Sequence, residues 1–317
     1  MRAATVWRRA TEKARARTVN PTDPRRPPWS GLALATAGAI AFSGKAIVAK
    51  LLYLRGLDAV TVLMLRMLFA LPFFVVLAWW GSRGKPALSA ADRRLVALLG
   101  VSGYYLASFL DFLGLQYISA SLERLILYLN PTLVLALGAL LFGRRITRHQ
   151  VGAIALSYVG VALVFGHEVG AQGPHAALGA LLVFGSAVSY AVYLAYSGEA
   201  VRRLGALRLV GLASTVACVL CIGQFFVLRP PELVLALPAS ALGLSLLNAT
   251  ACTVAPVLMV MLAIERIGPV LTAQTGMIGP MSTIVMGVVL LGEPFTPWVA
   301  AGTLLVLAGV WLLARAR

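Results

Sequence analysis

Long apolar runs constrain the fold of this chain more than any other feature. A helix needs about 20 mainly apolar residues to cross a bilayer, and ten segments of about that length occur. The strand alternation of a β-barrel is not visible, so we predict an all-α polytopic membrane protein with ten transmembrane helices. The expected spans are 30–54, 58–80, 95–116, 122–142, 149–166, 176–199, 209–228, 240–263, 269–291 and 297–314.

The charge composition argues against a soluble enzyme. Only 12% of the 317 residues are charged, and a soluble chain of this length needs about a quarter. The formal net charge is nevertheless +16. The basic residues lie between the apolar runs rather than on a wet, aromatic-rich face, which argues against a nucleic-acid partner. We therefore expect a multi-pass protein of the cell (inner) membrane, surrounded by a lipid bilayer.

The positions of Lys and Arg predict the orientation. With the N-terminus inside, 21 of them fall in the tail, the inside loops and the C-terminus, whereas only Arg55 and Arg229 fall in outside loops. This bias follows the positive-inside rule and predicts that both termini are cytoplasmic. Residues 1–29 would form a basic cytoplasmic tail. An organelle transit peptide is the alternative interpretation of this Arg-rich segment.

An internal repeat divides the chain into two halves. Residues 114–163 align without gaps on residues 263–312, at an offset of 149. Prolines and glycines at one offset are informative because each fixes a local backbone requirement. The shared pairs are Pro131/Pro280, Gly138/Gly287, Gly143/Gly292 and Gly160/Gly309.

The repeat predicts two five-helix units, 30–166 and 176–314. Five is an odd number, so the two units would be inverted relative to each other. Inverted repeats are typical of secondary transporters, which use them for alternating access around a site at the repeat interface. The alternative is a duplication retained only for packing.

The repeated segments also carry a family resemblance. They read GLQYISASLERLILYLNPTLVLALGALLFGRR and AIERIGPVLTAQTGMIGPMSTIVMGVVLLGEPFTP. These sequences resemble the two halves of EamA-type transporters of the drug/metabolite transporter superfamily. The family pattern ends the fourth span of a half in Gly-Glu. The second half has Gly292-Glu293, whereas the first half departs from the pattern with Gly143-Arg144-Arg145, which puts a role for a glutamate there in doubt.

The resemblance implies ten helices around a central cavity. It also implies export or exchange of small metabolites such as amino acids.

Six charged residues fall inside the expected spans of the first half. A charge in a span costs about 2.5–3.5 kcal/mol on insertion scales, so it must face a cavity or a partner. All six fall in the expected outer half, and they are Lys45, Lys50, Arg66, Asp111, Glu123 and Arg124. Four bases against two acids would favour a carboxylate or another anion, and a zwitterionic amino acid would find both signs. Structural explanations are snorkelling of Lys50 and an ion pair of Asp111 with Arg124 or Arg66.

We predict a substrate site on the fourth and ninth spans. The helical period places Glu123 and Asn130 on one stripe of the fourth span and Arg124 and Tyr128 on the next. Gln274 is an amide in the pseudo-symmetric ninth span, and an amide in lipid needs a partner. Lys45, Arg66 and Asp111 are the expected electrostatic partners, and either Glu123 or Asp111 can carry a proton for antiport.

The sequence contains no nucleotide-binding or hydrolase motif of the usual kinds. Cys218 and Cys221 lie inside an apolar span without histidines, which is typical of packing rather than of a metal site. We therefore expect no enzyme, no metal and no cofactor. The predicted function is a secondary transporter that exports a small metabolite, such as an amino acid or an organic acid, with a lipid or lipid-carrier flippase as the alternative. Proton coupling and a homodimer are left open.

Overall fold

The computed structural model describes residues 28–315 apart from 143–145, 169, 171 and 277. Almost all of the expected basic tail therefore lies outside the described residues, as do Gly143-Arg144-Arg145. The first half contains α2 (Pro28–Tyr53), α3 (Ala59–Ser82), α4 (Ala90–Leu99), the π-helical turn η1 (Gly100–Leu106), α5 (Ala107–Leu115), α6 (Ala120–Leu127), α7 (Asn130–Phe142) and α8 (Arg148–Glu168).

The second half follows the same order of elements. It contains α9 (Ala176–Leu204), α10 (Ala206–Leu228), the short α11 (Glu232–Leu235), α12 (Ala239–Ala249), the π-helical turn η2 (Thr250–Val254), α13 (Ala255–Gly276), α14 (Ile278–Leu291) and α15 (Pro297–Arg315). Within the described part of the chain there is no strand, which agrees with the predicted all-α class.

Among the described residues, eight helical segments are long and apolar enough to cross a membrane, and they coincide with the first eight expected spans. The other two apolar helices, Ile278–Leu291 and Pro297–Leu313, are shorter. The ninth expected span is divided between the end of α13 and α14, and α13 itself is interrupted at Gly268, where φ is +79°. A multi-pass helical membrane protein is thus confirmed, and the count of ten spans stays a prediction.

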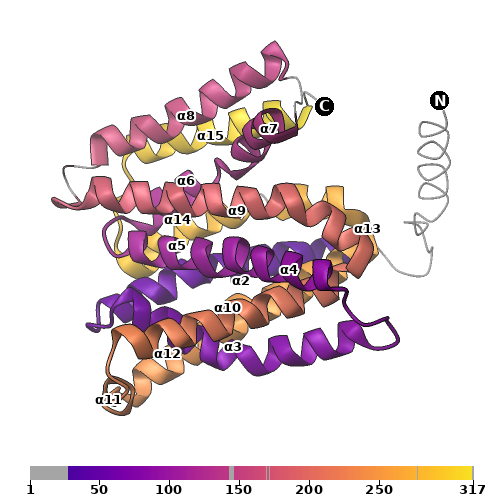
Figure 1. Cartoon of the computed structure of the whole chain (residues 1–317). Coiled ribbons are helices and arrows are strands. Elements are labelled where there is room, and N and C mark those ends of the chain that lie inside the picture. Colours follow the sequence, from indigo (N-terminus) through magenta and orange to yellow (C-terminus); the bar gives the residue numbers. More distant parts are fainter. Residues whose placement is uncertain (1–27, 143–145, 169, 171, 277, 316–317) are drawn as a thin grey trace, which may run out of the picture.

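Helices of the two halves pair reciprocally (Figure 1). α3 packs against α10, and α8 packs against α15. α2 packs against α13 and α14, while α9 packs against α5 and α7. Since α2 corresponds to α9, α5 to α13 and α7 to α14 in chain order, exchanging the halves leaves this set of pairs unchanged. The repeat in the sequence is therefore also a repeat in the packing.

Small residues allow the paired helices to approach closely. A methyl group added at Gly211 of α10 would lie 2.4 Å from the backbone nitrogen of Ala78 in α3. In the α8–α15 pair, a methyl group at Gly160 would lie 2.7 Å from the carbonyl oxygen of Gly302. Close backbone contact through small residues is how helices associate in lipid, where the hydrophobic effect between them is weak.

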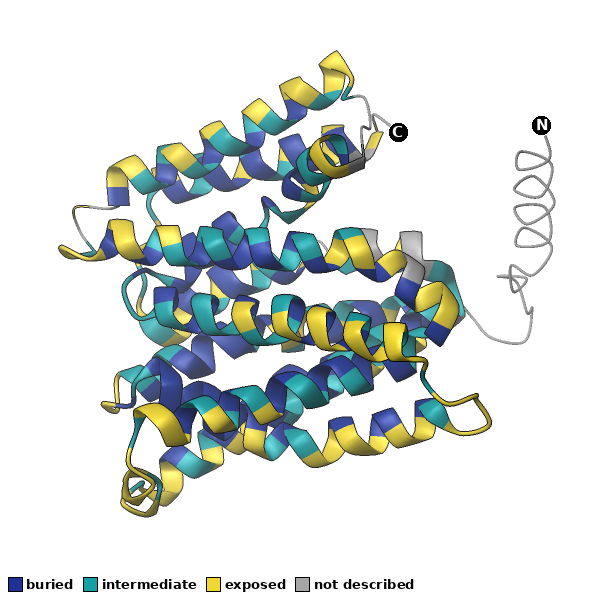
Figure 2. Ribbon diagram, viewed as in Figure 1, coloured by how far each residue is buried: buried dark blue, intermediate teal, exposed yellow. Residues whose placement is uncertain are grey.

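Large apolar side chains cover the outside of the molecule. Figure 2 shows exposed residues on the outward faces of α3 and α8 and buried residues toward the middle of the structure. Exposed members include Trp80, Leu140, Val227 and Val289. An apolar exterior of this extent requires a lipid environment rather than water.

A polar clasp joins the α2–α3 loop of the first half to the end of α10 in the second. Asp58 caps α3 by accepting a hydrogen bond from the Thr61 N–H at 3.2 Å. Its Oδ2 also accepts from Arg229, at 2.7 Å from Nη2 and 3.0 Å from Nε. Partial burial raises the Asp58 pKa, but the hydrogen bonds from Thr61 and Arg229 outweigh it, so the pKa lies below its ordinary value.

Glycine packing between α3 and α10 predicts a position-specific cost. Gly211→Ala should destabilise the protein by about 1–3 kcal/mol, because the new methyl group meets the backbone of α3. The matched control is Gly223→Ala on the same helix, where nothing lies within 4 Å of the added carbon. Thermal unfolding of the two purified variants in detergent measures the difference, and equal melting temperatures would contradict this packing.

The clasp predicts a pH-dependent contribution to stability. Because folding lowers the Asp58 pKa, the clasp stabilises the fold above the ordinary value of 3.8 and is lost as the pH falls through the lowered pKa. The side chains of Arg229 and Asp58 are 40% and 29% exposed, so Asp58→Asn should lower the free energy of unfolding by only about 0.2–1 kcal/mol at pH 7. The difference in melting temperature between wild type and Asp58→Asn should narrow as the pH falls below 3.8. A difference that stays constant on acidification would disprove the pH dependence.

Candidate functional site

A cavity of about 300 Å³ lies between the two halves and is lined by residues from both. Six of the residues predicted for the site line it: Lys45, Arg66, Asp111, Arg124, Tyr128 and Asn130. The second half contributes mainly neutral groups, among them Ser186, Tyr190, Ser214, Thr253 and Pro280. The charged end of the cavity is therefore built by the first half alone.

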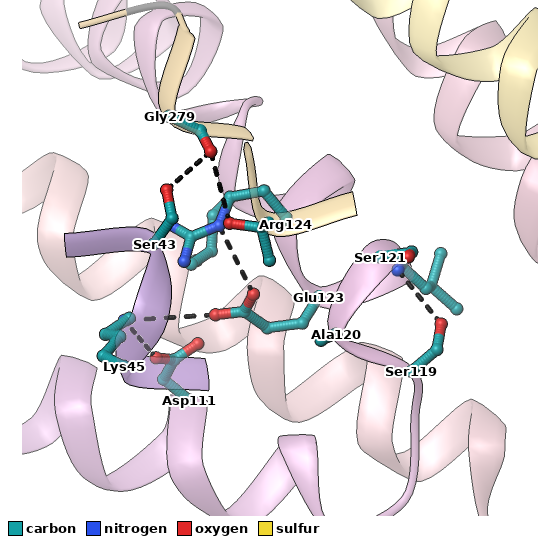
Figure 3. A network of polar contacts seen from close by, with 12 residues as sticks. Ser43, Lys45, Asp111, Ser119, Ala120, Ser121, Glu123, Arg124 and Gly279 are labelled. Carbon is teal, nitrogen blue, oxygen red and sulfur yellow. Dashed lines mark hydrogen bonds and ion pairs between the residues drawn. The ribbon is translucent and has the colours of Figure 1, made fainter. Parts of the chain in front are cut away.

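Four of the charged side chains form one continuous network (Figure 3). Lys45 Nζ lies 2.6 Å from Asp111 Oδ2 and 3.9 Å from Glu123 Oε1. Arg124 Nε lies 3.6 Å from Glu123 Oε2. All four residues are buried, with exposed fractions of 0–8%. The ion pairing of Asp111 therefore differs from the expected one, because its partner is Lys45 rather than Arg66 or Arg124.

Arg66 stands apart from this network. Its Nε donates to Thr253 Oγ1 at 2.9 Å, and its guanidinium lies 5.0 Å from the centre of the Phe112 ring. Within the described residues, Arg66 Nη1 has no hydrogen-bond partner. A buried guanidinium that faces a cavity with an unused donor is suited to binding an anionic group.

Irregular backbone positions several of the lining residues. In the first half, η1 carries Gly103 and Tyr104 to the cavity; in the second half, η2 carries Thr253. The Thr253 hydroxyl donates to the Asn248 carbonyl at 2.8 Å and accepts from Arg66. π-Helical turns often occur at functional sites. The sequence analysis missed both of them, because no local residue pattern distinguishes such a turn from the surrounding helix.

The fourth expected span is interrupted between α6 and α7, next to the charged network. Tyr128 ends α6, and Asn130 begins α7 with its amide donating to the Leu127 carbonyl at 2.8 Å. Pro131 follows at the second position of α7 and has no N–H to continue the helix. The break places both Tyr128 and Asn130 on the cavity wall.

Three other residues singled out in the sequence differ from the six that line the cavity. Glu123 is completely buried and lies behind the cavity, where it links Lys45 to Arg124. Gln274 lies on α13, but its side chain is outside the described part of the structure. Lys50, although described, is like Glu123 not among the lining residues, so the lining carries three bases and one acid, Asp111, which leaves a positive surplus of two.

The cysteines and acids provide no evident metal centre among the described residues, where no group of three metal-binding side chains comes together. Cys218 and Cys221 are free and buried, and the Cys218 thiol contacts Met67 Sδ at 3.7 Å. These contacts agree with a packing role.

Comparison with known proteins identifies the family. The model of the EamA-like transporter family matches residues 29–166 and 177–315. The chain belongs to this family. EamA proteins are part of the drug/metabolite transporter superfamily, and this chain is accordingly a membrane transporter.

Relatives of similar length carry the same general description. The chain is 30% identical to the uncharacterized transporter YcbK of Bacillus subtilis over 81% of its own length and 83% of that protein. It is 25% identical to an uncharacterized transporter of Archaeoglobus fulgidus, over 91% of this chain and 99% of the relative. A solved crystal structure with 18% identity superposes with a TM-score of 0.60 over 90% of this chain and 98% of the other, which supports the fold.

The network predicts a specific pattern of double-mutant coupling. Lys45→Met should destabilise the protein by about 3–5 kcal/mol, because Asp111 and Glu123 would lose a buried cation. Adding Asp111→Asn should restore part of the loss by removing the uncompensated charge. Thermal unfolding in detergent measures both variants. A double variant that is less stable than Lys45→Met alone would contradict the proposed charge compensation.

Proposed function

We propose that this transporter is a secondary carrier that moves a small organic solute by alternating access. The observation that carries the proposal is the position of the cavity, which is lined from both halves of a reciprocally paired repeat. In transporters built this way, each half can adopt the conformation of the other, and the site is opened to one side of the membrane at a time.

The proposed topology comprises ten spans in two inverted five-helix repeats, residues 30–166 and 176–314, with both termini in the cytoplasm. Support for it comes from the bias of Lys and Arg and from the two apolar helices that follow the eight long ones. The basic segment 1–29 is then a cytoplasmic tail, and the membrane is the cell inner membrane.

Polar atoms of the lining residues that lack a hydrogen-bond partner suggest the substrate chemistry. Within the described residues, Arg66 Nη1 and Arg124 Nη2 are donors without a hydrogen-bond partner, and Asp111 Oδ1 and Asn130 Oδ1 are acceptors without one. Buried polar groups are normally satisfied, so a ligand that supplies both kinds of partner would complete the site. A carboxylate would bind the arginines, and an amino group would bind the two oxygens.

The proposed substrates are therefore amino acids and related small organic acids. The surplus of two positive charges on the cavity lining favours the carboxylate end. Gln274 remains a proposed contact on the ninth span. The direction of transport, export, follows from the family resemblance.

Reconstitution into liposomes tests this function. Purified protein would be tested with a panel of labelled amino acids, organic acids and lipid carriers, with and without an imposed pH gradient. We expect at least one amino acid or organic acid to cross the membrane in a protein-dependent manner. Movement of a lipid carrier, with no soluble solute transported, would instead establish the flippase function.

The substrate role of Arg124 predicts a loss of transport without a loss of protein. Arg124→Ala should lower transport by roughly 10–100-fold, because a charge-assisted hydrogen bond to a carboxylate contributes about 1.5–3 kcal/mol. Arg55→Ala, in an exposed loop, is the matched control and should transport normally. If Arg124→Ala disappears from the membrane fraction, the arginine serves folding rather than substrate binding.

A further inference from the structure

Glu293 follows α14 in the second half, yet its carboxylate contacts the first half. Its Oε1 accepts from the Ala120 N–H at 2.6 Å. Its Oε2 accepts from the Ser121 N–H at 3.1 Å and from the Ser121 hydroxyl at 2.7 Å. Ala120 and Ser121 are the first residues of α6, where unpaired N–H groups favour a negative charge. One repeat thus supplies the cap of a helix in the other.

This cap completes the first turn of α6. The Ser119 N–H donates to Gln172 Oε1 at 2.9 Å, and the Leu122 N–H donates to Ser119 Oγ at 3.1 Å. Together with the two contacts to Glu293, every N–H from residue 119 to residue 122 has a protein acceptor. Since α6 has only eight residues, these contacts hold a large share of its backbone.

The backbone around Glu293 is shaped to present its carboxylate. Gly292 adopts a φ of +68°, which favours glycine and turns the chain back at the end of α14. The Glu293 N–H then donates to the Gly287 carbonyl at 3.1 Å. A methyl group at Gly287 would lie 2.7 Å from Glu293 Oε2, so this glycine leaves space for the carboxylate.

The opposite repeat lacks the matching groups. At the offset of 149, Ala120 corresponds to Pro269, and Glu293 corresponds to Arg144. Proline has no N–H to donate, so a carboxylate at position 144 could not make the equivalent bond to the first residue of that helix. The first half therefore lacks the Gly-Glu pair, and the second half lacks the N–H group that such a glutamate would bind.

We propose that Glu293 is a positioning residue for the charged site. It fixes the start of α6, and Glu123 and Arg124 follow Ser121 by two and three residues. Figure 3 shows Ala120 and Ser121 on the turn that leads to both charged side chains. Glu293 acts across the repeat boundary and does not line the cavity. The proposal adds to the proposed function, but it can be tested without a substrate.

The test uses a cysteine reporter at the far end of α6. The substitution Leu127→Cys, called the α6 reporter, would be made in a full-length chain carrying Ala at the three native cysteines, because Leu127 lines the cavity and is partly exposed. Its rate of labelling by N-ethylmaleimide in detergent reports opening of α6. Glu293→Gln should raise that rate about tenfold, equivalent to about 1.4 kcal/mol of lost capping.

A second reporter separates local positioning from general loosening. The substitution Ser108→Cys, called the α5 reporter, lies in the same cavity, and its labelling should stay unchanged in Glu293→Gln. Glu232→Gln on α11 is the matched substitution away from α6 and should change neither rate. In Glu293→Asp, which keeps the charge, the α6 reporter should be labelled more slowly than in Glu293→Gln.

Ser121→Ala keeps the test decisive if Glu293→Gln cannot be purified in a folded form. It removes one of the three contacts and should raise labelling of the α6 reporter by about threefold. Where both variants fold, the increase in labelling rate in the double variant should be smaller than the product of the two separate increases, because both substitutions act on one contact. The proposal is overturned if labelling of the α6 reporter is unchanged in these variants, or if the two reporters respond equally. Neither result depends on whether a solute is transported.

Discussion

A lysine ammonium between two buried carboxylates is the interaction on which the site depends. Lys45 lies within 4 Å of both Asp111 and Glu123, and Glu123 in turn lies beside Arg124. Removing Lys45 would leave Asp111 uncompensated in a low-dielectric environment, which costs far more than the pair gains, whereas without Arg124 the carboxylate of Glu123 still lies near Lys45. The network therefore joins α2, α5 and α6 by charge, whereas α3–α10 and α8–α15 are joined by close contact of small residues.

The same constraint explains where the backbone departs from a regular helix. At membrane depth, an unpaired N–H or carbonyl is tolerated only if it is buried in protein or faces a cavity. The two π-helical turns and the α6–α7 break all lie beside the cavity. Side chains compensate η2 and the break, because Thr253 donates to the Asn248 carbonyl and Asn130 donates to that of Leu127. Glu293 does the same for the N–H groups at the buried start of α6. Polar side chains thus allow a short, interrupted helix to carry the site.

The sequence predicts those parts of this arrangement that depend on composition. Apolar runs locate the helices, and a charge or amide inside such a run is exceptional enough that Lys45, Arg66, Asp111, Arg124 and Asn130 could be selected without a structure. Pairing could not be predicted, because Lys45 and Asp111 are 66 positions apart and the sequence favoured Arg66 or Arg124 as the partner of Asp111. One sequence feature relates to the role of Glu293: the position equivalent to Ala120 in the second half is Pro269. This difference can be interpreted only once the structure shows that Glu293 contacts the start of α6.

The two halves share the same helix packing, but they contribute different kinds of side chain to the cavity. Among the described residues, the charged groups at the cavity come from the first half, and the second half contributes hydroxyl groups and the aromatic ring of Tyr190. Because the charges are already paired within one repeat, a movement between the repeats need not separate them. A contact between a charge and a neutral group, such as that of Arg66 with Thr253, can be broken at a smaller electrostatic cost than an ion pair. We therefore infer that the charged end of a solute stays with α2, α3, α5 and α6 while the second half moves around it.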